Sequence, residues 1–162
     1  MTQTATITEE AVVAALREVY DPEIPDLSLV DLGIYRGAIF ATEGVTVEIT
    51  PTFVGCPALD YMKEQIVERF AELWPGTPVT VKVSHDRPWT SDQISEEGRR
   101  RLKRSGFAPP PKGNVIRLEP LVECPYCNSR NTALENAFGP TLCRAIYYCK
   151  NCRQPFEQFK AV

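Results

Sequence analysis

A pair of C-x-x-C motifs near the end of the chain constrains its fold more than any other sequence feature. The motifs are Cys124-Pro125-Tyr126-Cys127 and Cys149-Lys150-Asn151-Cys152, separated by 21 residues. Each motif places two thiolates on one side of a tight turn, and two such turns complete a tetrahedron around one metal ion. The spacing therefore predicts a four-cysteine zinc ribbon over residues 119–162, ligated by Cys124, Cys127, Cys149 and Cys152.

The predicted ribbon has too few residues to bury a core of its own, so the metal should be its main source of stability. Its role is then structural, because protein sulfurs fill all four positions around the ion. Four thiolates also suit a single iron ion, and we favour zinc because the sequence shows no redox cofactor motif. Cys143 is left over. We expect it to lie buried beside the ribbon, with a transient ligand role as the alternative.

The chain has 162 residues, enough for one ordinary domain or two small ones, and a net charge of −3. This balance gives no indication of binding to nucleic acid or to a membrane surface, and no apolar run reaches the length of a membrane span. The N-terminal residues lack the basic start and apolar core of a signal peptide, so we expect a cytoplasmic protein. In that reducing compartment the six cysteines should be metal ligands or reactive thiols rather than disulfides.

Hydrophobic periodicity predicts an α+β domain over residues 6–108, with a small three-stranded sheet and covering helices in the order α-β-β-α-β-α. The expected elements are a helix over residues 7–19 with a Thr6 and Glu9 capping box, one helical turn over 28–32 that stops at Gly33, a hairpin of strands 34–40 and 45–49, a helix from Cys56 to Trp74, a strand over 79–83, and a helix capped by Ser91 or Ser95 that ends before Gly106. A Pro-rich linker over residues 109–118 should connect this domain to the zinc ribbon.

Cys56 lies where a predicted strand ends and an amphipathic helix begins, in the stretch Thr50-Pro51-Thr52-Phe53-Val54-Gly55-Cys56-Pro57. Gly55 allows a sharp turn and Pro57 suits a first helical turn, so Cys56 should stand at or near the helix N-cap. There the unpaired N–H groups and the helix dipole would lower the pKa of the thiol below its free value of about 8.5. A small buried residue that closes the turn is an equally good interpretation of this pattern.

Other charged residues have simpler explanations. Asp21 and Glu23 lie in the stiff turn Asp21-Pro22-Glu23-Ile24-Pro25, where turn chemistry and solvation account for both carboxylates. The basic run from Arg99 to Arg104 lies at the end of a predicted helix, so we expect a solvated or partner-facing surface rather than a nucleic-acid site. The lone histidine, His85, is expected in a loop.

Several motifs together carry a resemblance to known families. Residues 8–108 resemble the small domain shared by iron–sulfur assembly and targeting factors, through Asp21 to Pro25, Val30-Asp31-Leu32-Gly33-Ile34, Thr50 to Pro57 and Asp86-Arg87-Pro88-Trp89-Thr90. Nearly the whole chain resembles the D component of multicomponent phenylacetyl-CoA epoxidases, which belong to aerobic phenylacetate catabolism. That likeness adds Trp89 to Arg100, Gly106 to Pro110, and Phe138-Gly139-Pro140-Thr141-Leu142-Cys143-Arg144-Ala145. One departure is Arg87, where many relatives of the assembly domain have the first of two prolines before the Trp.

The resemblance implies an accessory protein rather than a catalytic subunit. The oxygenase subunit of such a system carries a di-iron centre, which needs Glu and Glu-x-x-His ligands that this sequence lacks. The chain also lacks the flavin, nicotinamide and plant-type ferredoxin motifs of a reductase. The implied role is assembly or maturation of a metal centre in the epoxidase, with its oxygenase subunits as partners. Cys56 would transiently hold iron or an iron–sulfur cluster, with Asp21 and Glu23 as acidic partners.

A second hypothesis is a stable structural or regulatory subunit that binds the oxygenase complex through the zinc ribbon, without metal transfer. Cys56 would then be only a packed residue. An enzyme with Cys56 as its nucleophile is the weakest interpretation, because no His/Asp pair accompanies that cysteine in the sequence.

Overall fold

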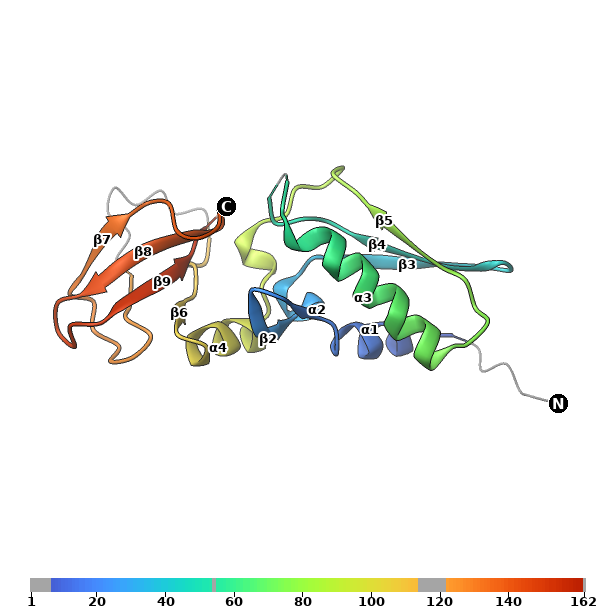
Figure 1. The fold of residues 1–162 in the computed structure, drawn as a ribbon, viewed down its shortest axis with the longest axis horizontal. Helices are drawn as coiled ribbons and strands as arrows, with labels where there is room; N and C mark the ends of the chain where they lie inside the picture. Colours follow the sequence, from blue (N-terminus) through green and yellow to red (C-terminus); the bar gives the residue numbers. More distant parts are fainter. Residues whose placement is uncertain (1–6, 54, 114–121, 162) are drawn as a thin grey trace. The chain divides into compact units, whose positions relative to one another are not determined.

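A computed structural model describes residues 7–53, 55–113 and 122–161. The chain forms two compact units, Met1–Pro88 and Trp89–Val162, whose elements are labelled in Figure 1. Three parts of the sequence predictions lie outside the described residues: the cap residue Thr6, Val54 of the Cys56 stretch, and residues 114–121 where the predicted linker meets the ribbon.

A three-stranded sheet is the centre of the first unit. β3 (Tyr35–Ala41) and β4 (Gly44–Ile49) form the predicted antiparallel hairpin, and β5 (Val79–Val83) pairs parallel with β4. The strand order is therefore β3-β4-β5. Val45, Val47 and Ile49 alternate with half-buried polar residues and lie in the core, which is why period-two patterning identified this strand.

Two helices pack on this sheet. α3 (Ala58–Leu73) crosses it diagonally in Figure 1 and buries Met62, Ile66 and Phe70 at helical spacing. α1 (Glu9–Leu16) packs against α3 and β3. The first helix is shorter than the predicted residues 7–19, and Thr8, whose hydroxyl accepts from the Ala11 N–H, caps it.

The helix is short because the following residues pair as strands. β1 (Tyr20–Asp21) and β2 (Ile24–Ser28) form a small antiparallel sheet that the sequence analysis did not predict. Asp21 closes their turn, since its Oδ1 accepts from the N–H groups of Glu23 at 2.7 Å and Ile24 at 3.1 Å. The turn interpretation of Asp21 is thus confirmed. The predicted helical turn follows as α2 (Leu29–Leu32), which ends at Gly33 with φ 75°.

The second unit contains α4 (Glu96–Arg104) and a four-stranded sheet. Its strands are β6 (Phe107–Ala108), β7 (Thr132–Asn136), β8 (Arg144–Cys149) and β9 (Pro155–Phe159), in the order β6-β9-β8-β7. A short 3₁₀ turn, η1 (Ser91–Gln93), precedes α4. Ser95 caps α4 by accepting from the Gly98 N–H at 2.9 Å. The predicted fold class, an α+β domain followed by a ribbon-like sheet, is confirmed.

The two compact units meet in sequence at Pro88 and Trp89 rather than at the predicted domain end, residue 108. Trp89 packs edge-to-face on Phe159 at 6.0 Å between ring centroids. β6 pairs parallel with β9, which lies some fifty residues later in the chain. These contacts place residues 89–108 with the ribbon. The predicted domains, residues 6–108 and 119–162, stay a prediction, because compactness alone does not test which segments fold independently.

The described part of the predicted linker is tied to the second unit. Arg99 donates to the carbonyl oxygens of Ser91, at 2.7 Å, and of Pro110. The Gly113 N–H donates to Asp92 Oδ1 at 2.8 Å. Arg99 is only 8% exposed, so the expectation of a solvated or partner-facing basic run is wrong for this residue: two backbone carbonyls accept hydrogen bonds from its Nη atoms in the interior.

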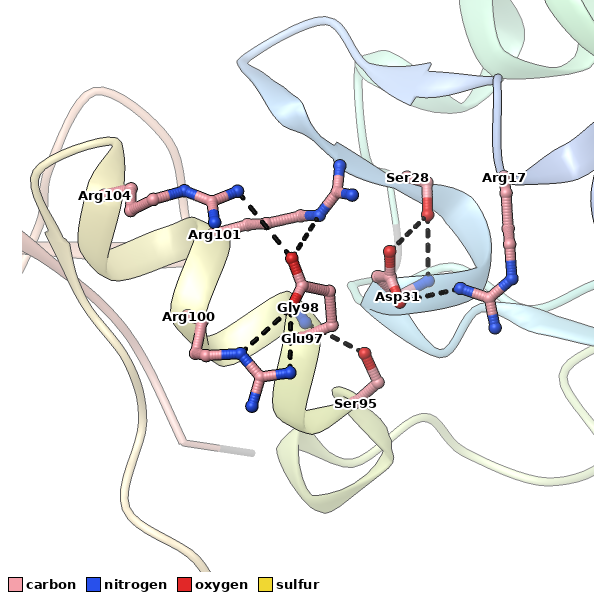
Figure 2. Close-up of polar contacts among 9 residues, drawn as sticks. All are labelled: Arg17, Ser28, Asp31, Ser95, Glu97, Gly98, Arg100, Arg101 and Arg104. Atoms are coloured by element: carbon pink, nitrogen blue, oxygen red, sulfur yellow. Dashed lines mark hydrogen bonds and ion pairs between the residues drawn. The ribbon is translucent and has the colours of Figure 1, made fainter.

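The remaining arginines of α4 meet at one carboxylate. Arg100, Arg101 and Arg104 all pair with Glu97, as Figure 2 shows. Arg100 and Arg104 are exposed, in accordance with the prediction of a solvated face. Across the described residues, no helix is long and apolar enough to span a bilayer.

The fold yields a test at Gly44, where β4 begins. A Cβ there would lie 2.3 Å from the Pro78 carbonyl oxygen. This oxygen accepts a hydrogen bond from the Val45 N–H at the point where the pairing of β4 with β5 begins. Gly37 also has a positive φ but nothing within 4 Å of its added Cβ. We expect Gly44→Ala to lower the free energy of unfolding by about 1–3 kcal/mol more than Gly37→Ala does, as measured by urea denaturation. Equal losses would contradict the close approach.

Candidate functional site

Four cysteine sulfurs converge in the second unit. The Sγ atoms of Cys124, Cys127, Cys149 and Cys152 all lie within 4.8 Å of one another. Sγ–Sγ distances are 3.7 Å for Cys124–Cys152 and 3.6 Å for Cys127–Cys149. Four metal–thiolate bonds of about 2.3 Å in a tetrahedron would put the sulfurs about 3.8 Å apart. The group therefore fits one tetrahedral metal ion, and the described residues hold no other cluster of three or more such ligands.

Each pair of cysteines stands on the same backbone turn. In the first turn, the Cys124 N–H donates to the Ser129 carbonyl and the Asn128 N–H to the Cys124 carbonyl, both at 2.9 Å. The second turn repeats this pattern: the Cys149 N–H donates to the Gln154 carbonyl at 3.0 Å, and the Arg153 N–H donates to the Cys149 carbonyl at 2.9 Å. Asn128 and Arg153 have φ near 60°, the left-handed conformation that reverses each turn. Backbone hydrogen bonds thus place the sulfurs.

The sulfur group has one buried side and one side that is partly exposed to solvent. Cys124 and Cys149 are fully buried, whereas Cys127 and Cys152 are half-buried. The buried pair belongs to a small core with Val122, which precedes the first cysteine turn, and with four side chains from β6, β8 and β9, namely Ala108, Ala145, Tyr147 and Phe156. An ion would therefore enter from the side of Cys127 and Cys152.

The surroundings shift the pKa values of these thiols in opposite directions. The backbone hydrogen bond from Ser129 and the side-chain amide of Asn151 lower the pKa of Cys127 to about 6. Burial raises the pKa of Cys124, and desolvation followed by the neighbouring sulfurs raises the pKa of Cys152. Four adjacent thiolates repel one another, so a bound cation would have to displace the remaining protons.

Cys143 lies apart from this group. It precedes β8, whose last residue is Cys149, so six residues of extended chain separate the two by about 20 Å. Its Sγ lies 3.1 Å from the Thr141 hydroxyl. The side chain is half-buried rather than buried as expected.

Cys56 lies at the start of α3 in the first unit. It precedes Pro57, the N-cap, and its carbonyl accepts from the Leu59 N–H at 3.2 Å. Gly55 makes the preceding turn with φ 79°. The prediction of a position near the N-cap is confirmed, and the side chain is half-buried. The thiol is thus partly accessible at the end of the helix where anions are favoured.

The acidic candidates are not assembled with Cys56 into a ready metal site. β1, which contains Asp21, packs against α3. Among the described residues, however, no cluster of three or more ligand side chains includes Asp21, Glu23 or Cys56. Asp21 Oδ1 is moreover occupied by two backbone N–H groups of its own turn.

Sequence reasoning missed a buried carboxylate, Asp31. Arg17 Nη1 pairs with Asp31 Oδ1 at 3.2 Å, and the Ser28 hydroxyl donates to Asp31 Oδ2 at 2.9 Å; both contacts are drawn in Figure 2. This network holds α2 in place. Two residues beyond α2, the Ile34 carbonyl accepts a hydrogen bond from the Thr50 N–H at 2.8 Å. Asp31 therefore supports the strand end from which the Cys56 stretch departs. Its three-residue spacing from Ser28, a capping pattern, was the available signal.

Comparisons with known proteins find one family match in each of the two compact units. Residues 9–83 match the family described as "Iron-sulfur cluster assembly protein", and residues 108–160 match the "PaaD zinc beta ribbon domain". The chain is 40% identical to an Escherichia coli protein named as a subunit of a 1,2-phenylacetyl-CoA epoxidase, over 92% of this chain and 90% of that protein. It is 38% identical to an Fe-S protein maturation auxiliary factor of Porphyromonas gingivalis, over 56% of this chain and 86% of the relative.

Two solved structures share part of this fold. A domain of unknown function from Bacillus anthracis, 23% identical, superposes with a TM-score of 0.54 over 58% of this chain and 90% of that one. A conserved hypothetical protein of Thermotoga maritima, 28% identical, superposes with a TM-score of 0.52 over 63% of this chain and 98% of that one.

The sulfur geometry predicts which cysteines bind metal. Cys127→Ser should abolish stoichiometric metal binding and unfold the ribbon, because three sulfurs leave the tetrahedron incomplete. Cys143→Ser should keep full metal content, since its sulfur lies far from the group. Elemental analysis of the purified variants, with near-UV circular dichroism as the folding readout, measures both. Loss of metal in Cys143→Ser would contradict the assignment.

Proposed function

Because the chain belongs to the family of the phenylacetyl-CoA epoxidase D component, we propose that it is an accessory protein of that epoxidase in the cytoplasm. It helps to assemble or mature a metal centre in the oxygenase subunits. The observation that carries this proposal is the joining of two parts in one chain. An iron–sulfur assembly domain presents the half-buried thiol of Cys56, and a four-cysteine ribbon follows it.

Cys56 suits transient rather than permanent binding of iron or an iron–sulfur cluster as cargo. One thiolate at a helix N-terminus binds a metal centre, but it supplies only one of the ligands that such a centre needs. The remaining ligands would come from the donor or the acceptor protein, and we propose Asp21 and Glu23 as acidic partners in the same domain. A cargo held by so few ligands leaves readily once the acceptor offers a complete set.

The ribbon has a different role in this proposal, since it holds one structural zinc ion. Four preplaced sulfurs close the coordination sphere and leave no position for a substrate. We expect one zinc and no iron per chain in protein purified without added metal, measured by elemental analysis. A chelator that removes the zinc should unfold the ribbon and leave the first unit folded, because that unit has its own core. Iron at unit stoichiometry in the ribbon would overturn this assignment.

The test of the Cys56 role is to co-express the oxygenase subunits with variants of this chain. Cys56→Ala should fold normally, because the volume change is small, yet yield oxygenase with less iron and proportionally lower epoxidase activity. Cys143→Ala removes a second half-buried thiol and serves as the matched control, with full iron and activity expected. Oxygenase with full iron content beside Cys56→Ala would remove the maturation mechanism.

A second candidate function is a stable subunit that binds the oxygenase through the ribbon without metal transfer. Among the described ribbon residues, four large hydrophobic side chains are more than half exposed: Tyr126, Leu134, Phe138 and Leu142. Exposed apolar surface of this kind favours an interaction site. The two functions differ in stoichiometry, because a stable subunit stays with the purified active epoxidase in fixed ratio. A maturation factor leaves, and epoxidase reconstituted from fully metallated subunits then works without it.

A further inference from the structure

The edge strand of the first sheet offers unpaired backbone groups. Within the described residues, β5 lies at the end of the order β3-β4-β5 and pairs with β4 alone. The Val45 N–H donates to Pro78 and the Ser84 N–H to Ile49, so the even-numbered residues of this strand face β4. In a parallel strand the N–H and C=O groups of the odd-numbered residues then face the open edge. These are Val79, Val81 and Val83.

A groove runs between this edge and α3. Its volume is about 640 Å³, and its lining comes from five positions on α3 and one on β5: Asp60, Lys63, Glu64, Val67, Glu68 and Val81. Val67 is 43% exposed, so its side chain is open to contact within this groove. A strand edge beside a helix, with an apolar floor between them, is the arrangement that binds added peptide strands.

The charge of the groove selects the occupant. Three carboxylates line it against a single lysine, Lys63, which lies 2.6 Å from Asp60. Glu68 accepts a neutral amide hydrogen bond from Gln65, at 2.8 Å. The groove therefore carries net negative charge and attracts lysine or arginine side chains. A second copy of this chain would bring its own carboxylates against these, so self-pairing is disfavoured.

We propose that this groove binds an extended basic segment of another protein, which pairs with β5 as a fourth strand. Side chains on one face of the segment contact Val67 and Val81, and lysine or arginine side chains contact Glu64 and Glu68. This binding uses neither Cys56 nor the four-cysteine group, so its success or failure is separate from that of the proposed function.

The probe is a fluorescein-labelled heptapeptide of alternating lysine and valine, with alternating glutamate and valine as its counterpart. Titration of the full chain, followed by fluorescence anisotropy, should show saturable binding of the basic peptide only. Amide hydrogen exchange should slow at Val79, Val81 and Val83 in the complex. Equal binding of the two peptides, or unchanged exchange at these amides under saturating peptide, would overturn the proposal.

Two variants localise the binding. Glu64→Lys should lower the affinity for the basic peptide about fivefold or more. Glu135→Lys makes the same charge change at an exposed position of β7 and should alter this affinity less than about twofold. Val81→Pro removes an edge-facing N–H, which edge strands tolerate, and should abolish binding while unfolding stays cooperative. Equal effects of Glu64→Lys and Glu135→Lys would contradict the site even if Val81→Pro fails to fold. A dimer lost in Glu64→Lys, detected by sedimentation, would assign the edge to a second copy and overturn the proposal.

Discussion

Repulsion among four adjacent sulfurs is the constraint on which the second unit depends. Backbone turns hold Cys124, Cys127, Cys149 and Cys152 within 4.8 Å, a separation at which several thiolates cannot coexist without a cation. The surrounding core is small, so little else opposes that repulsion. We therefore expect folding of the ribbon and occupancy of its metal position to be one equilibrium. The first unit lies outside this coupling because buried aliphatic side chains such as Leu16 and Ile66 stabilise its sheet and helices.

The two candidate sites differ in the number of ligands that each supplies, and the proposed roles, permanent binding and transfer, follow from this difference. The ribbon supplies four sulfurs and closes the coordination sphere. Cys56 lies at the start of α3, and no cluster of three ligands includes it in the described part of the chain. A centre held by one residue exchanges quickly, whereas one held by four persists. Under the proposed function, a chain with both sites keeps its own fold independent of the metal centre that it passes on.

The sequence allowed prediction of elements whose pattern is local. The β3–β4 hairpin, α3 and the ends of α4 follow from period-two and period-3.6 patterning and from caps such as Ser95. The cysteine spacing likewise located the sulfur group. Pairings distant in sequence were missed, such as β6, whose two residues become a strand only by joining β9. The burial of Arg99 was missed for the same reason, since its partner Pro110 lies beyond the helix.

The pairing of β6 with β9 limits how this protein can be divided or recombined. A fragment that began at residue 109 would retain every ribbon cysteine but would lose β6, the Trp89–Phe159 contact and the Arg99 hydrogen bonds. Its sheet would then expose a fresh edge at β9, and unprotected edges promote aggregation. Gene fusions that exchange ribbons among relatives should therefore have breakpoints before Trp89, so that the exchanged module carries its own helix and edge strand.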